Sequence, residues 1–102
     1  MVADGRVVVT SDNRGLILLT LDGDFDLANA DELRRVLSST LHGGQREVTL
    51  DMSGVGFVDS TVLGVLATES IKGMTLTLRG APDTTRRLLA TAGLDRTIRV
   101  ED

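Results

Sequence analysis

The hydrophobic residues between positions 47 and 78 change their spacing twice, and this change limits the folds that the chain can adopt. Val48, Leu50 and Met52 alternate with polar residues, which is the period of a β-strand. Residues 61–72 carry apolar side chains at the spacing of a mostly buried helix, and residues 74–78 alternate again. Two strands joined by a helix need a crossover connection, so we expect them to lie parallel in one sheet.

The N-terminal part of the chain is predicted to form a β-hairpin followed by a helix. Residues 6–10 and 16–21 have the composition of strands, and residues 11–15 provide turn residues between them. The acidic run at 22–26 is expected to end the second strand. A helix should follow, with apolar residues at amphipathic spacing and with His42-Gly43-Gly44 as its end; these apolar residues are Leu33, Val36, Leu37 and Leu41.

Glycines and a proline divide the C-terminal part of the chain. Gly73 follows the helix that ends near Lys72, and residues 80–83 break the next strand. The last residue of that break, an aspartate, is the expected N-cap of a short helix at 86–92 that Gly93 ends. We expect Leu88 and Leu89 to face the core, and a last strand at 98–100.

These elements predict an α/β fold in which residues 1–102 form one domain. At this length the chain can build a single hydrophobic core. The order is a hairpin followed by β-α-β-α-β-α-β, which gives a mixed sheet covered by helices on both faces or mainly on one. The family resemblance described below implies helices packed mainly on one face. The strand at 16–21 is expected to be central because it is nearly continuously apolar. The strand at 47–52 is expected to be the second inner strand, from its alternation and from the family resemblance described below.

Composition excludes several classes of function. The formal net charge is −4 and only two aromatic residues are present, so we expect no binding to nucleic acid and no attraction to anionic membranes. The chain has no cysteine, no apolar run of membrane-spanning length and no signal-peptide pattern at its start, which favours a cytoplasmic protein.

A search for catalytic or metal-binding patterns gives little. His42 has no second ligand at useful spacing, and Asp22, Asp24 and Asp26 lack the closing glutamate of a calcium loop. Gly54-Val-Gly56 lacks the lysine of a P-loop, and backbone freedom in a strand-to-loop bend explains these glycines better. We therefore predict no metal, no cofactor and no enzymatic activity.

Ser60 lies at the junction between a predicted strand and a predicted helix, where two interpretations remain open. A serine there can cap the helix, which local physics favours. The same place suits a phosphate group, because free backbone N–H groups and the positive end of the helix dipole meet there.

Three segments of the chain carry recognisable motifs. Asp51-Met-Ser-Gly-Val-Gly-Phe-Val-Asp-Ser-Thr-Val-Leu-Gly is similar to the signature of the STAS family, the anti-sigma factor antagonists, in which an Asp-x-Ser strand leads to Asp-Ser-Ser/Thr-Gly-Leu-Gly. Leu21-Asp-Gly-Asp-Phe-Asp-Leu-Ala resembles its L-x-G-x-L/F-D-x-A segment, and residues 80–96 resemble its G-x-x-P-x-x-R-R-L-L-x-x-x-G-L-D-R segment. The order and spacing of the three segments also agree with the family.

The resemblance implies a role for particular residues. Ser60 occupies the position of the phosphoacceptor, and the surface that contacts the partner would include Asp24, Asp26, Asp59, Thr61, Val62, Leu63 and Gly64. Unphosphorylated, such a protein binds an anti-sigma factor that is a serine kinase of the ATPase fold, and a sigma factor is released. The kinase phosphorylates the serine, and a PP2C-type phosphatase removes the phosphate. The protein is thus a substrate and a binding module, not an enzyme.

Two departures from the family pattern lead to further expectations. Val62 replaces the usual glycine, and its bulk is expected to obstruct the docking surface. This favours an alternative function, a STAS interaction or scaffold module without phosphorylation, in a sensory or lipid-transport complex. The chain ends at Asp102, where many members continue into a helix, so an exposed sheet face could support a homodimer.

Overall fold

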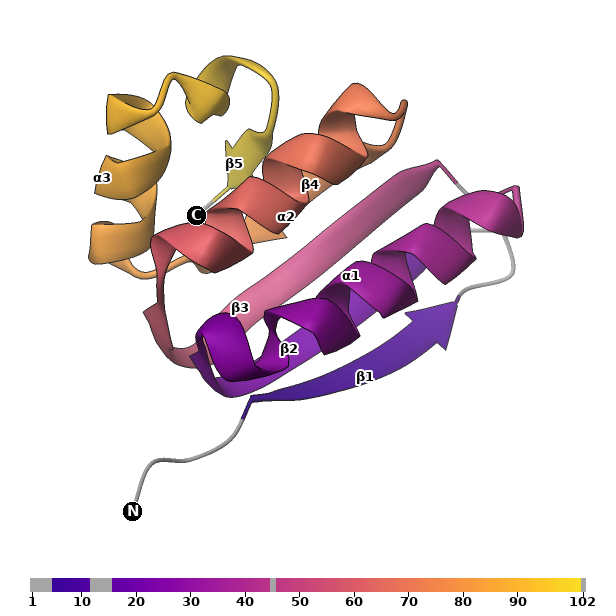
Figure 1. The fold of residues 1–102 in the computed structure, drawn as a ribbon, viewed down its shortest axis with the longest axis horizontal. Coiled ribbons are helices and arrows are strands. Elements are labelled where there is room, and N and C mark those ends of the chain that lie inside the picture. The colour runs from indigo at the N-terminus through magenta and orange to yellow at the C-terminus, as the bar shows by residue number, and fades with distance from the viewer. Residues whose placement is uncertain (1–4, 12–15, 45, 102) are drawn as a thin grey trace.

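The computed structural model describes residues 5–11, 16–44 and 46–101. Five strands form one sheet in the order β1-β2-β3-β4-β5, with β1 antiparallel to β2 and the other neighbours parallel (Figure 1). The elements in chain order are β1 (Arg6–Ser11), β2 (Ile17–Phe25), α1 (Leu27–His42), β3 (Glu47–Val58), α2 (Ser60–Ile71), β4 (Thr75–Arg79), α3 (Asp83–Thr91), the 3₁₀ turn η1 (Leu94–Arg96) and β5 (Arg99–Glu101).

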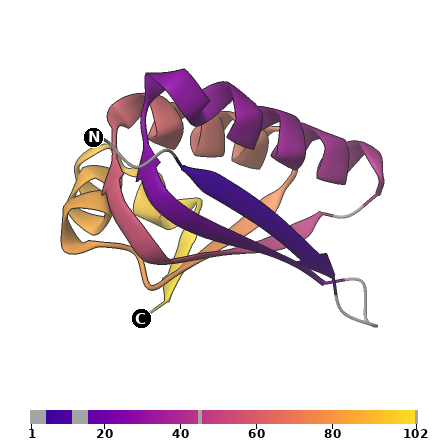
Figure 2. The ribbon, with the colours of Figure 1, turned by 90° about the horizontal axis from the view of Figure 1, so that it is seen from below.

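The helices cover one face of the sheet. Figure 2 shows α1 and α2 side by side above the strands, and α3 lies near β4 and β5 in Figure 1. The strands send alternate side chains into the core beneath these helices, including Ile17, Leu19, Leu21, Val48, Leu50, Met52, Leu76 and Leu78. The predicted α/β fold, its mixed sheet and its two inner strands are confirmed. The predicted turn at 11–15 lies mostly outside the described residues.

The strands β2 and β3 both extend further than predicted. The acidic residues expected to break β2 continue it to Phe25, with irregular register between Thr20 and Asp22 and between Gly23 and Asp24. Gly54 and Gly56 do not form a bend either, because both lie within β3. A Cβ on Gly54 would clash with the Asp22 carboxylate. The glycines therefore let the aspartate side chains lie across the neighbouring strand.

The ends of α2 and α3 also differ from the predictions. The N-cap of α2 is Asp59 rather than Ser60. The N-cap of α3 is Pro82, and the helix begins at Asp83 without a side-chain cap. Leu89 is buried as expected, but Leu88 is 40% exposed. Leu88 precedes Leu89 by one residue, a rotation of about 100° that turns its side chain away from the core.

Glu69 is an unusual member of the core, because its side chain is completely buried in α2. Neither carboxylate oxygen accepts a hydrogen bond within the part of the chain that the structure describes. Glu69 forms an ion pair with Lys72, whose Nζ lies 3.7 Å from Oε1 and whose side chain is half exposed. An ion pair of this geometry compensates poorly for the loss of hydration of a buried carboxylate.

Glu69→Met is therefore expected to raise the free energy of unfolding, by about 1–4 kcal/mol, since methionine fills a similar volume without a charge. Urea denaturation followed by circular dichroism measures the change. Lys72→Met is the matched control and should destabilise, because it leaves the buried carboxylate unpaired. A lower midpoint for Glu69→Met than for wild type would contradict this account.

Candidate functional site

The candidate site lies where two parallel strands end and two helices begin. Phe25 and Val58, the last residues of β2 and β3, pair in the sheet. The Asp59 N–H donates to the Phe25 carbonyl oxygen over 3.1 Å. Parallel strands end at the same edge of a sheet, so the first turns of α1 and α2 lie next to each other. This arrangement brings Asp26 and Asp59, one residue beyond each strand, to the same corner.

Asp59 fixes the start of α2 and leaves Ser60 exposed. The Asp59 Oδ1 accepts a hydrogen bond from the Val62 N–H at 3.2 Å, which is the geometry of an N-cap. Ser60 is the first residue of the helix, and its side chain is exposed to solvent. The capping role that local physics assigned to Ser60 thus belongs to its neighbour. The Ser60 hydroxyl stands at the positive end of the helix without being needed to hold that end.

This division of roles predicts that two neighbouring alanine substitutions have different effects on stability. Asp59→Ala should lower the free energy of unfolding by about 0.5–2 kcal/mol through loss of the cap. Ser60→Ala should leave it within about 0.5 kcal/mol of wild type, as for other surface substitutions. Thermal and urea unfolding of both variants give the comparison, with Asp59→Asn as the control that retains a side-chain oxygen. A larger loss of stability in Ser60→Ala than in Asp59→Ala would show that Ser60, and not Asp59, caps α2.

Asn29 holds the neighbouring corner between β2 and α1. Its Oδ1 accepts from the Asp26 N–H at 2.9 Å, and its Nδ2 donates to the Asp24 carbonyl oxygen at 2.8 Å. Asp26 in turn caps α1, because its Oδ1 accepts from the Ala28 N–H at 2.9 Å. Sequence analysis did not identify Asn29. The sequence pattern that could have revealed it is a capping box in which asparagine replaces the usual glutamate or glutamine.

Ser60 and the residues expected to contact a partner fall into three groups by exposure. Asp24, Asp26 and Asp59 are partly buried at the corner, while Ser60, Thr61 and Gly64 are exposed; the remaining two, Val62 and Leu63, are buried. The prediction that Val62 adds bulk to the docking surface is therefore wrong. Its side chain is only 1% exposed, because the helix turns this position toward the core.

An apolar groove begins at Ser60 and runs between α2 and α3. It has a volume of about 300 Å³ and is lined by Ser60, Leu63, Gly64, Leu88, Thr91, Ala92 and Leu94. Gly64 leaves open space above α2, since nothing lies within 4 Å of the position that a Cβ would take there. The exposed Leu88 forms part of the opposite wall. Sequence analysis missed this groove because it assigned Leu88 to the core.

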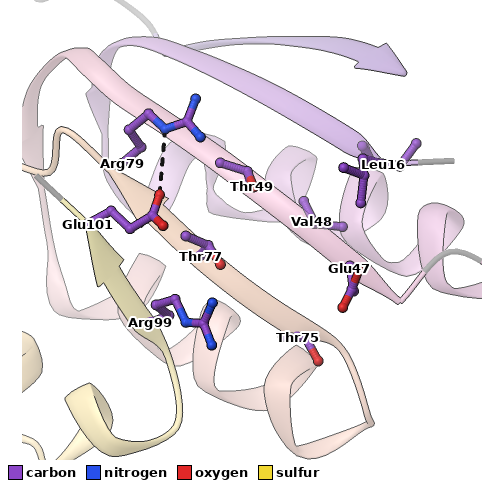
Figure 3. A pocket seen from close by; sticks show the side chains of 10 residues that line it. Leu16, Glu47, Val48, Thr49, Thr75, Thr77, Arg79, Arg99 and Glu101 are labelled. Atoms are coloured by element: carbon purple, nitrogen blue, oxygen red, sulfur yellow. Dashed lines mark ion pairs between the residues drawn. The ribbon is translucent and has the colours of Figure 1, made fainter. Parts of the chain in front are cut away.

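A second hollow, on the uncovered face of the sheet, has a different character. It measures about 250 Å³ and lies over β3, β4 and β5 (Figure 3). Threonines line its middle, and Arg79 Nε lies 3.7 Å from Glu101 Oε1 at one end. Nearby, hydrogen bonds from the Ser53 N–H and hydroxyl lower the pKa of Asp51. This part of the uncovered face is polar.

Within the described part of the chain, no three histidine, cysteine or carboxylate side chains gather in a way that would hold a metal ion. None of the helices described is long and apolar enough to cross a membrane. The features of the site are therefore an exposed hydroxyl, an acidic corner and an apolar groove.

The sequence and the fold of this chain are similar to those of known proteins. A family model described as "Mlab, STAS domain" matches residues 9–100. The anti-sigma-F factor antagonist RsfB of Mycobacterium tuberculosis is 30% identical over 102 residues, which cover 95% of this chain and 82% of RsfB. An anti-sigma factor antagonist from Mycobacterium paratuberculosis has a similar fold, with a TM-score of 0.83 and 22% identity over 95% of this chain and 85% of that one.

The antagonist SpoIIAA has the same fold. Its unphosphorylated form superimposes with a TM-score of 0.74 at 16% identity, covering 95% of this chain and 88% of SpoIIAA. A structure of SpoIIAA from Bacillus in the phosphorylated form gives a TM-score of 0.73, also at 16% identity, and covers 95% and 92%. The match to the family model over nearly all of its length and the similarity to RsfB together show that the chain belongs to the STAS domain family.

Proposed function

We propose that this chain is an anti-sigma factor antagonist that is controlled by phosphorylation of Ser60. Without phosphate it binds an anti-sigma factor serine kinase of the ATPase fold, and a sigma factor is released. The observation that carries the proposal is the exposed Ser60 hydroxyl at the start of α2, next to the apolar groove, with the cap supplied by Asp59. The names of RsfB and of the structural relatives support the antagonist role.

The switch follows from the charge that phosphate adds. The kinase transfers the terminal phosphoryl group of ATP to the Ser60 oxygen and releases ADP and a proton. A phosphoserine carries a charge of about −1.5 to −2. The start of α2 stabilises this charge within the free protein. A partner that covered the groove would have to strip water from it beside the carboxylate of Asp59. Binding would then weaken until a PP2C-type phosphatase hydrolysed the phosphoserine.

The burial of Val62 bears on the choice between the two functions that the sequence left open. The scaffold function was favoured because Val62 was expected to obstruct docking and phosphorylation. A side chain that points into the core obstructs neither. SpoIIAA, a protein of the same fold, has been solved in both phosphorylation states, which is in keeping with a phosphorylation switch. We therefore prefer the switched antagonist.

The proposed role is regulatory binding rather than catalysis. STAS proteins of the antagonist type are regulatory binding proteins, in agreement with the predicted lack of enzymatic activity. The proposal places the protein in the cytoplasm, where sigma factors meet RNA polymerase. The acidic corner formed by Asp24, Asp26 and Asp59 would lie at the edge of the surface that the kinase covers.

Phosphorylation by the cognate kinase tests the proposal. We expect incubation with the anti-sigma factor and ATP to add one phosphate, and peptide mass spectrometry to place it on Ser60. Ser60→Ala should remain unmodified, while Thr61→Ala, which removes the adjacent hydroxyl, should still receive its phosphate on Ser60. Modification of Ser60→Ala at Thr61, or no modification of wild type by a kinase that is active on ATP, would reject the assignment.

A further inference from the structure

β1 forms one edge of the sheet, and its outer side is open. It pairs with β2 along its full length, and no other strand that the structure describes lies beside it. Such an edge presents unpaired N–H and C=O groups, which natural proteins usually protect with prolines, lysines or bulges. The β1 sequence Arg-Val-Val-Val-Thr-Ser has no proline and one charge, and its register with β2 contains no bulge. We propose that two copies of this chain associate through β1, antiparallel and about a two-fold axis.

Each face of β1 carries an exposed valine next to this edge. Val8 and Val9 are 47% and 52% exposed. Val9 pairs with the buried Leu19 and so points to the helix-covered face, whereas Val8 pairs with Thr20 and points to the uncovered face. A shallow groove of about 340 Å³ continues outward from Val9 along α1, lined by Val9, Arg35, Val36, Ser39 and Thr40. An added strand would cover all of these surfaces at once.

The geometry of a two-fold axis selects the register of such a pair. A two-fold axis perpendicular to the sheet keeps the helices of both copies on the same face. Opposed residues of the two β1 strands must then have their side chains on the same face of the sheet. This is possible only if the axis passes beside one residue, which opposes the same residue of the partner. With Val8 at the axis, Val7 opposes the partner's Val9, and Arg6 opposes the partner's Thr10.

This register is compatible with the side chains that it brings together. Apolar residues oppose apolar residues, and the two Arg6 side chains lie at opposite ends of the pair rather than facing each other. The partner's Val7 would lie next to Val9, at the groove beside α1. The chemistry of the edge thus fits a second copy of itself. The polar hollow in Figure 3 is lined mainly by β3, β4 and β5, and none of its lining residues that the structure describes belongs to β1.

The proposed dimer leaves the Ser60 surface of each copy open. Ser60 belongs to α2, which follows β3, and β2 separates β3 from the dimer edge. The self-association therefore does not depend on the proposed phosphorylation switch, and each can fail without the other.

Sedimentation equilibrium of the full chain over a dilution series tests the association. We expect wild type to change from dimer to monomer on dilution. Val8→Lys and Val9→Lys should each raise the dimer dissociation constant at least about tenfold, because a buried lysine at the pairing edge loses its hydration. Ile71→Lys is the control, since Ile71 is 83% exposed at the end of α2, far from β1. Circular dichroism confirms that each variant is folded.

Single cysteines locate the axis, because the natural chain contains none. Opposed residues of an antiparallel pair have Cα atoms about 4.5–5.5 Å apart, within the range of a disulfide. Val8→Cys should form a covalent dimer rapidly on mild oxidation, and Ile71→Cys should not. Fast linking of Val9→Cys instead would support the edge pairing with the axis moved by one residue. A wild type that stays monomeric at the highest concentration, or equal linking of Val8→Cys and Ile71→Cys, would overturn the proposal.

Discussion

Ser60→Asp is expected to weaken binding to the anti-sigma factor by about a hundredfold or more, while the fold remains intact. The new carboxylate would stand next to Asp59 and at the mouth of the apolar groove, where a bound partner excludes water. An uncompensated charge in such an interface loses its hydration and meets a like charge. Isothermal titration calorimetry against the anti-sigma factor measures the change. Ser60→Ala should bind with wild-type affinity, and ATP should not release it.

A matched charge elsewhere separates the effect of position from that of net charge. Ala90→Asp adds the same charge to an exposed position of α3 that does not line the groove. Its affinity should stay close to that of wild type. If Ala90→Asp weakened binding as much as Ser60→Asp, the loss would reflect the overall charge of the protein, and the local switch would be rejected. Wild-type affinity of Ser60→Asp would reject it as well.

Leu66→Ala is expected to lower the free energy of unfolding by about 2–5 kcal/mol. Leu66 is 1% exposed in the middle of α2, so truncation removes buried apolar surface and leaves a cavity beneath the helix. Domains of this size have total stabilities of about 5–15 kcal/mol, so the loss would be a large part of the whole. Urea denaturation should show a lower midpoint with an unchanged slope.

Ile71→Ala provides the comparison within the same helix. Ile71 is 83% exposed, and its truncation should change the stability by no more than about 0.5 kcal/mol. Equal losses in Leu66→Ala and Ile71→Ala would show that α2 is rotated about its axis relative to the described arrangement.

The sequence by itself determined the order of the elements and which faces of them are buried. Alternation at Val48, Leu50 and Met52, and helical spacing around Leu66, indicate which side chains are buried. This information is local, because each hydrophobic pattern describes a single strand or helix. The α/β class and the inner position of β2 and β3 follow from it. Ser60 became a candidate through the motifs that resemble the family, since its local surroundings alone favoured a cap.

The tertiary structure decided the features that depend on neighbours distant in the chain. β3 continues through Gly54, whose lack of a side chain leaves room for the Asp22 carboxylate of β2, and no local sequence pattern predicts that approach. Leu88 is exposed beside α2 rather than buried, which creates the groove next to Ser60. Spacing along the chain indicates which face of an element is apolar, but not which other element covers that face or leaves a residue such as Leu88 exposed. The acidic corner, the groove and the open edge of β1 all depend on which elements pack or pair with each other.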